Sequence, residues 1–226
     1  MTRTVERFRK VDVLVNTAGR GMKDVSPEFL TEPTRFWETG PEFWKMLVDT
    51  GVNGPFFMAR AVVPGRLEAG GGSIVNVSIN YEPMKRRGFS PYGPSKAALE
   101  SELIIYAQDL EGTGIRLNGF LPGGATETRM LPSGLFEEVP SRLLRPGIVA
   151  GPAIYPASDD SDHLTGHRLV SLPIGLPRAS KGPSPLTAWE PKTKDLCVFR
   201  HCCYRGASTI TTAVGERSEP AQLLSS

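Results

Sequence analysis

A tyrosine and a lysine placed four residues apart offer the clearest chemistry in this sequence. Tyr92 and Lys96 lie in Ser-Pro-Tyr-Gly-Pro-Ser-Lys-Ala-Ala-Leu, residues 90 to 99, at the predicted start of a helix. Side chains at this spacing share one helix face. A phenol has an ordinary pKa of about 10, and a nearby ammonium favours the phenolate. We therefore predict an acid/base pair in which Lys96 lowers the pKa of Tyr92.

A serine precedes this pair at the end of a predicted strand. The run Gly-Ser-Ile-Val-Asn-Val-Ser, residues 72 to 78, is short, apolar and β-branched behind glycines, which is typical of a buried strand. Ser78 at its end is placed to hydrogen-bond a carbonyl or hydroxyl of a substrate. A strand-end hydroxyl bonded to backbone is the structural alternative.

Further strands and helices surround these residues. Strands are predicted at 11–15, 115–120 and around 164–170. Helices are predicted at 2–10, with Val5 and Phe8 inward, as a pair over 41–69, and at 147–158. The helix that opens near Tyr92 carries one apolar stripe, made of Leu99, Leu103, Tyr106 and Leu110.

These residues and motifs resemble the short-chain dehydrogenase/reductase (SDR) family from about Val5 to Val170. Besides Tyr92-x-x-x-Lys96 and 72–78, the resemblance rests on Asp12-Val-Leu-Val-Asn-Thr-Ala-Gly19, Ile115-Arg-Leu-Asn118, Pro122-Gly123 and Ala157-Ser-Asp-Asp-Ser-Asp-His-Leu-Thr-Gly166. It implies an α/β fold for residues 1–171: a partial Rossmann-like, doubly wound parallel sheet that lacks the first three strands of the family. Residues 172–226 have no sustained periodicity, and we predict an irregular or disordered tail there.

The resemblance also implies roles for particular residues. Tyr92 would exchange a proton with the substrate, and Lys96 would lower the Tyr92 pKa and hold the nicotinamide ribose. Ser78 would orient the substrate. The cofactor would pass along Asn16, Ala18 and Gly19 and meet Pro122, Gly123 and Thr128, although Thr126 and Thr128 are equally suited to turns. Residues 131–146 would form a substrate lid.

Two positions depart from the family pattern. The family serine lies thirteen residues before the tyrosine, where this chain has Ile79, and Ser78 is one residue further away. The family asparagine that holds a water near the lysine corresponds to Gly51. Asn53, two residues on, is a possible replacement that lies on another side of the backbone.

The implied function is an NAD- or NADP-dependent oxidoreductase that interconverts a small-molecule alcohol and a carbonyl compound. The sequence contains no Gly-x-x-x-Gly-x-Gly, the motif that brings a pyrophosphate to a helix N-terminus. We therefore expect impaired or absent activity in this chain. The alternatives are a non-catalytic fragment or pseudoenzyme that dimerises through the helices at 55–69 and 95–112, and a sequence with no stable product.

Composition bounds the remaining possibilities. A net charge of +2 gives no reason to expect nucleic acid, and the apolar runs are too short to span a membrane. With no leader peptide apparent, we expect a cytoplasmic protein, a homodimer, homotetramer or hetero-oligomer with a complete relative. No metal site is expected: Cys197, His201, Cys202 and Cys203 lack the second pair of a tetrahedral site.

Overall fold

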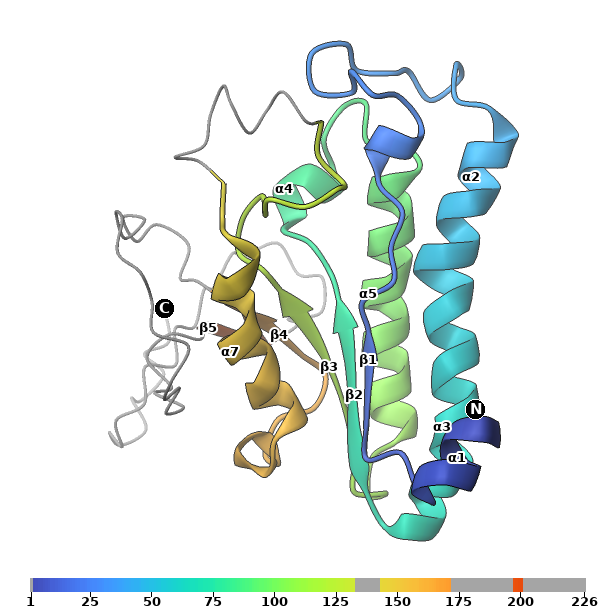
Figure 1. The fold of residues 1–226 in the computed structure, drawn as a ribbon, viewed down its shortest axis with the longest axis vertical. Coiled ribbons are helices and arrows are strands. Elements are labelled where there is room, and N and C mark those ends of the chain that lie inside the picture. The colour runs from blue at the N-terminus through green and yellow to red at the C-terminus, as the bar shows by residue number, and fades with distance from the viewer. Residues whose placement is uncertain (1, 133–142, 172–196, 201–226) are drawn as a thin grey trace, which may run out of the picture.

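The computed structural model describes residues 2–132, 143–171 and 197–200 (Figure 1). Their centre is one five-stranded sheet with the strands in chain order. Four strands are parallel, and the last runs antiparallel to its neighbour. They are β1 (Val13–Asn16), β2 (Gly72–Val77), β3 (Ile115–Leu121), β4 (His167–Val170) and β5 (Cys197–Arg200).

The apolar strands predicted from the sequence form the buried centre of this sheet. The adjacent residues Ile74 and Val75 of β2 are each 1% exposed. They pack in different core clusters on opposite faces of the sheet, because successive strand residues point to opposite faces. Every residue of β3 is buried. A strand covered on both faces is rich in apolar residues. The buried polar side chains of β3, Arg116 and Asn118, are hydrogen-bonded.

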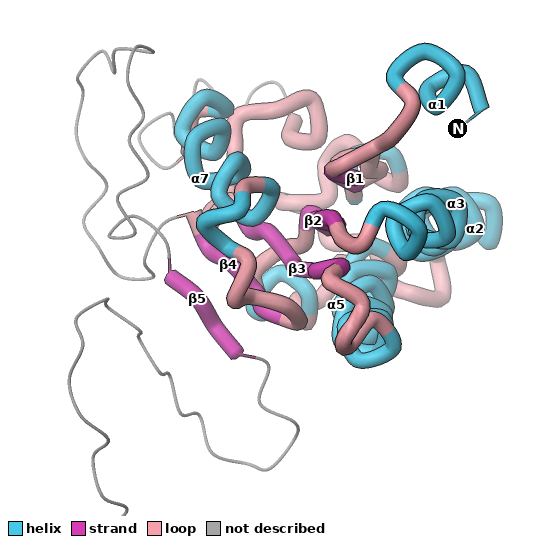
Figure 2. Tube along the Cα trace, turned by 90° about the horizontal axis from the view of Figure 1, so that it is seen from below, coloured by secondary structure: helices cyan, strands magenta, loops and turns pink. Residues whose placement is uncertain are grey.

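Long helices cover one face of the sheet (Figure 2). These are α2 (Pro41–Val48), α3 (Gly54–Ala69) and α5 (Tyr92–Asp109), and a short helix, α4 (Tyr81–Met84), precedes α5. Leu103 of α5 and Val62 of α3 meet Ile74 of β2 in one core cluster. The stripe predicted on α5 is buried at Leu99, Leu103 and Leu110, and Tyr106 is partly buried.

The other face is covered by a run of short helical segments. They are η4 (Pro146–Val149), α7 (Ala150–Ile154), η5 (Tyr155–Ala157) and η6 (Asp159–Ser161). Their Tyr155 packs with Val75 and Phe120 of the sheet.

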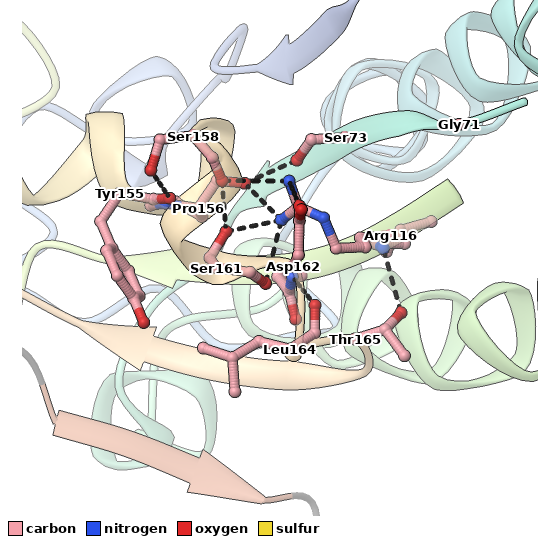
Figure 3. Close-up of polar contacts among 12 residues, drawn as sticks. Gly71, Ser73, Arg116, Tyr155, Pro156, Ser158, Ser161, Asp162, Leu164 and Thr165 are labelled. Carbon is pink, nitrogen blue, oxygen red and sulfur yellow. Dashed lines mark hydrogen bonds and ion pairs between the residues drawn. The ribbon is translucent and has the colours of Figure 1, made fainter. Parts of the chain in front are cut away.

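Arg116 of β3 fastens these segments to the sheet (Figure 3). The guanidinium donates to the carbonyls of Pro156, Ser158 and Ser161 over 3.1 to 3.3 Å, and it lies 3.1 Å from a carboxylate oxygen of Asp162. Only 9% of Arg116 is exposed, so each of these bonds replaces water that the group has lost.

Three expectations need correction. Helix α1 (Thr2–Phe8) forms, but Val5 and Phe8 are 41% and 65% exposed because no described element covers them. The two helices predicted over 41–69 are continuous: Asp49–Asn53 form a π-helical turn, η2, with helical backbone on both sides. Within the tail predicted to be irregular, β5 pairs with β4.

No helix in the described ranges combines the length and the apolar character that crossing a bilayer requires. The remaining part of the tail, with Cys202 and Cys203, lies outside the described residues, as do Leu135 and Phe136 of the predicted lid.

Candidate active site

Several of the predicted site residues lie in the segments at the carboxyl ends of the parallel strands, and the strands and α5 can be followed in Figure 1. Asn16 ends β1, Ser78 follows β2, and Pro122 follows β3, while α5 begins at Tyr92 beside them. In open α/β sheets this edge is where ligands bind. The sequence order of strand, serine, loop and helix therefore brings the predicted groups to the expected edge of the fold.

Tyr92 lies where helix α5 begins, under a small apolar cluster. Its ring is partly buried against the cluster of Met22, Phe29 and Phe89, to which Leu131 also contributes. Gly93 lets α5 start there, because a Cβ on it would collide with the backbone carbonyl oxygen of Met84 at the end of α4. The close approach of these two helices fixes the direction in which Tyr92 leaves the backbone.

Lys96 lies one turn along the same helix, as the spacing predicts. Its Nζ is 5.9 Å from the centroid of the Tyr92 ring. The side chain is buried, with 7% exposed, and Nζ donates a 2.8 Å hydrogen bond to the carbonyl of Val77, the last residue of β2. The ammonium is therefore anchored to the strand end rather than to the phenol.

Burial sets the ionisation of both groups. It raises the pKa of Tyr92 to about 12. Burial lowers the pKa of Lys96 from 10.5 to about 8, against the opposing pull of the Glu100 carboxylate. The pKa of Tyr92 is therefore shifted upward, opposite to the expected lowering, because burial removes water from around the phenol.

Ser78 is buried, and its hydroxyl faces α5. It donates a 2.6 Å hydrogen bond to Oε1 of Glu100, two helical turns beyond Tyr92, and its amide donates to the carbonyl of Phe120. The neighbouring Ile79, at the family position of the serine, contributes its carbonyl to Arg168 over 2.9 Å. The structure thus brings Ser78 to the helix of the pair but not to the phenol.

Asn53 points away from Lys96. Its side-chain amide donates to Asp49 over 2.8 Å on the exposed side of the π-helical turn. Gly51 instead faces α5: a Cβ there would lie 3.2 Å from Oγ of Ser95, the residue before Lys96. An asparagine at position 51 would need Ser95 to move.

The predicted cofactor-binding residues lie on three loops at this edge. Asn16 donates to the Asn76 side chain over 2.8 Å, which joins β1 to β2, and Ala18 and Gly19 are exposed. The carbonyl of Gly123 accepts from Asn80 over 3.2 Å, and Pro122 is partly buried.

Thr128 belongs to a turn of its own. Its Oγ1 accepts a 3.4 Å hydrogen bond from the Met130 amide, and its side chain is exposed. Thr126 makes a backbone bridge to Leu144. The Thr126 hydroxyl donates to the carbonyl of Gly124 over 3.3 Å, so both threonine side chains are hydrogen-bonded to backbone within their own loop.

Two charged residues near the pair were not predicted from the sequence. Arg168 of β4 and Glu100 of α5 form an ion pair of 2.9 Å, and their side chains are only 6% and 5% exposed. The guanidinium also lies 3.8 Å over the ring of Tyr81. One signal was available: Glu100 is four residues after Lys96 and so shares its face, and an arginine inside an apolar strand needs a partner.

These residues fit only one end of a nicotinamide dinucleotide. Tyr92, Lys96 and the loops after β1 and β3 are suited to the nicotinamide and its ribose, because they converge at the ligand edge of the sheet. A pyrophosphate needs glycine-rich backbone at a helix N-terminus, and the sequence has no such motif. The residues present therefore fit the nicotinamide end of the cofactor and not the whole dinucleotide.

Comparisons with known proteins agree with the fold. The family model described as short chain dehydrogenase matches residues 1–135. The chain is 30% identical over 181 residues to the 3-oxoacyl-(acyl-carrier-protein) reductase of Thermotoga maritima. This alignment covers 77% of this chain and 69% of the relative. It is 31% identical over 169 residues to a 3-alpha-(or 20-beta)-hydroxysteroid dehydrogenase of Mycobacterium tuberculosis, covering 74% and 61%.

Solved structures give the same result. A gluconate 5-dehydrogenase from Burkholderia cenocepacia, solved in complex with NADP and tartrate, is 25% identical with a TM-score of 0.61, over 75% of this chain and 66% of the other. A 3-ketoacyl-(acyl-carrier-protein) reductase from Brucella melitensis, complexed with NADH, is 26% identical with a TM-score of 0.63, over 75% and 69%.

The chain spans 61 to 69% of the length of these four relatives. The match to the family model covers more than half of the chain, and the reductase of Thermotoga maritima is aligned over more than two thirds of its length. This chain belongs to the short-chain dehydrogenase/reductase family, a family of NAD(P)-dependent oxidoreductases.

Proposed function

We propose that the chain carries the proton-transfer centre of an NAD(P)-dependent oxidoreductase that acts between a small-molecule alcohol and a carbonyl compound. In this proposal the Tyr92 hydroxyl exchanges the proton, and Lys96 holds positive charge one turn away. When bound, the nicotinamide supplies or accepts the hydride. Relatives solved with NADP and with NADH support the choice of cofactor class.

We further propose that this polypeptide by itself has impaired activity. The supporting observation is that three predicted catalytic groups are engaged by the protein. Lys96 donates to Val77, Ser78 donates to Glu100, and Asn53 donates to Asp49. A phenol whose pKa is about 12 is also a poor general base near neutral pH. A substrate and a ribose would have to displace these contacts.

A cofactor titration tests this proposal. We expect NADH and NADPH added to the purified chain to show no change in nicotinamide fluorescence below millimolar concentration. Lys96→Met serves as the matched variant, because it removes the group expected to hold the ribose. Binding at micromolar concentration that Lys96→Met abolishes would overturn the proposed impairment and support an active centre.

A second function, self-association, has its own observation. Phe57 of α3 and Ile105 of α5 are 61% and 52% exposed on helices that cover the same face of the sheet. The ring centroids of Phe56 in α3 and Tyr106 in α5 are 6.4 Å apart, so the two helices form one surface. Apolar patches of this kind mark association sites. We propose that the chain forms a homodimer or homotetramer, or pairs with a complete relative, through this surface.

A cytoplasmic location suits this proposal. The three cysteines of the chain are Cys197, Cys202 and Cys203, so residues 1–171 have no disulfide framework to maintain. Proteins without structural disulfides are the rule in reducing compartments.

A further inference from the structure

Three consecutive residues at the end of β2 are each held by a charged side chain. The carbonyl of Val77 accepts from Lys96 over 2.8 Å, and the hydroxyl of Ser78 donates to Glu100 over 2.6 Å. The carbonyl of Ile79 accepts from Nη2 of Arg168 over 2.9 Å. Together Lys96, Glu100 and Arg168 form a row of alternating charge along α5 and β4, which we call the charged row.

The charged row is buried. Lys96, Glu100 and Arg168 are 7%, 4% and 5% exposed. Buried charges are costly unless they are paired and hydrogen-bonded. Here Glu100 forms an ion pair with Arg168, and its carboxylate also acts electrostatically on Lys96. Oε1 of Glu100 accepts both Ser78 Oγ and Arg168 Nε. The arrangement is therefore specific, and neither outer cation keeps its environment if the carboxylate is removed.

The row is connected to the candidate active site at one end. Lys96 belongs both to the row and to the pair with Tyr92. At the other end, Arg168 links β4 to the loop that follows β2, through Ile79 and through the ring of Tyr81 at 3.8 Å. Strand β4 thus supports the lysine without touching it.

We propose that Glu100 and Arg168 are positioning residues for Lys96. They fix the backbone of 77–79, on which the Lys96 ammonium rests, and they balance its charge. In this assignment the Ser78 hydroxyl serves the charged row, as a hydrogen-bond donor to Glu100, and does not orient the substrate. The positioning role rests on the proposed function. The contacts of Glu100 and Arg168, and the titration of Lys96, do not depend on a cofactor.

The ionisation of Lys96 provides the test. Among the described residues, the charged or titratable groups that lie near Lys96 and Glu100 are Tyr92, Arg168 and Tyr81, and the Tyr81 ring lies under the Arg168 guanidinium. With lysine labelled at Cε, the carbon chemical shift of Lys96 is followed against pH, and Lys96→Arg identifies its signal. In the unchanged chain we expect a pKa of about 8.

Two variants should shift this pKa in opposite directions. Glu100→Gln keeps the shape but removes the balancing charge, so the pKa of Lys96 should fall by about one unit. Arg168→Met removes the competing cation, leaves the carboxylate to Lys96 alone and should raise the pKa. Glu111 is an exposed carboxylate beyond the end of α5. Glu111→Gln changes the net charge by the same amount as Glu100→Gln and should leave the pKa of Lys96 unchanged.

Loose packing alone would give a different result. If Glu100 and Arg168 only filled space, both variants would admit water and move the pKa of Lys96 upward toward 10.5. A rise in Glu100→Gln, or no shift in either variant, overturns the proposal. If Glu100→Gln fails to fold, Ser78→Ala replaces it. This variant removes the Ser78 hydroxyl that donates to Oε1 of Glu100, so the pKa of Lys96 should rise. An unchanged pKa of Lys96 would contradict the proposal.

The titration also separates this proposal from the proposed function. It uses no nicotinamide cofactor, so absence of NADH binding bears only on the oxidoreductase proposal. Opposite shifts in Glu100→Gln and Arg168→Met would support the charged row even in a chain that binds no cofactor.

Discussion

Lys96 is an ammonium that the fold buries at a cost in stability. Its pKa is about 8 in the folded chain against an ordinary 10.5, so between these values the unfolded state binds more protons. The free energy of unfolding must therefore rise as the pH rises from about 8 to 10.5. Below pH 8 both states carry the charge, and the cost of burying it is fully present.

The first prediction follows from this cost. Lys96→Met should be more stable than the unchanged chain at pH 7, by about 1–3 kcal/mol, because an apolar side chain of similar length replaces a buried charge. Its stability should also lose the rise between pH 8 and 10. Urea unfolding at pH 7 and at pH 9.5 measures both effects.

A lysine at the surface provides the control. Lys45 pairs with Asp49 on the exposed side of α2, so Lys45→Met should change stability by less than about 1 kcal/mol at either pH. Equal or lower stability of Lys96→Met at pH 7 would show that the bonds of the charged row outweigh the burial cost.

At the residue scale, the sequence located the pair but not its contacts. The four-residue spacing of Tyr92 and Lys96 depends on helix geometry alone, and the structure has both on one face. The partner of Ser78 depends on which way the chain turns after β2, and on Arg168, ninety residues later, which draws Glu100 and Ile79 together. No local pattern carries that information.

At the element scale, close approach of backbone decides where α5 begins. The Cβ of an alanine at Gly93 would meet the carbonyl oxygen of Met84, a backbone atom that cannot swing aside. The same substitution at Gly65, inside α3, would meet nothing within 4 Å. The two glycines therefore differ only in what surrounds them.

The second prediction compares these glycines. Gly93→Ala should lower the free energy of unfolding by about 1–3 kcal/mol, because α4 must move away from α5. Gly65→Ala should raise it by about 0.5–1 kcal/mol, because alanine is the better helix former. Chemical denaturation of both variants measures the difference, and a stabilising effect of Gly93→Ala would mean that α4 does not pack against α5 as described.

The third prediction concerns the attachment of the short helices to the sheet. Arg116→Met removes one donor from each of the carbonyls of Pro156, Ser158 and Ser161, which keep their other donors, so it should cost about 1–3 kcal/mol. The loss should be local as well as global, since residues 155–165 depend on this side chain. Hydrogen exchange in that segment should accelerate more than exchange in α5.

Arg86→Met is the matched control for this prediction. Arg86 pairs with Glu82 on an exposed face of the chain, and loss of such a pair costs less than about 1 kcal/mol. Uniform acceleration of exchange across the sheet in Arg116→Met, with none specific to 155–165, would contradict the fastening role.

Most elements were predictable, and the exceptions have physical reasons. The buried strands and the helix at Tyr92 follow from continuous apolar runs and a 3.6-residue period. A pair of helices was predicted over 41–69, but Asp49–Asn53 form a π-helical turn that joins them, at the place where Gly51 packs against Ser95 of α5. Packing of this kind is invisible to local propensity.

At the scale of the whole molecule, the two sides of the sheet are covered unequally. β2 and β3 are buried on both faces, whereas Val15 of β1 is 43% exposed and α1 leaves Phe8 in solvent. The helices α3 and α5 also present Phe57 and Ile105 to solvent. Two apolar surfaces thus remain open, one at the edge strand β1 and one on the helices that cover the sheet.

The helical surface is the better candidate for self-association. Helices α3 and α5 are 16 and 18 residues long, so a second copy laid along both could bury the roughly 1,000 Å² that a specific interface needs. The open edge of β1 has four residues, Val13–Asn16, which limits the number of hydrogen bonds that another strand could add.

The last prediction tests the helical surface. We expect the unchanged chain to have the mass of a dimer or tetramer by size-exclusion chromatography with light scattering. A double variant, Phe57→Glu with Ile105→Glu, should have the mass of a monomer, because each interface would then bury unpaired carboxylates. Trp37→Glu alters an equally exposed aromatic side chain on the loop before α2 and should leave the assembly intact. A monomeric unchanged chain would contradict association, whereas a dimer that survives the double variant but not a change at Val15 would move the interface to β1.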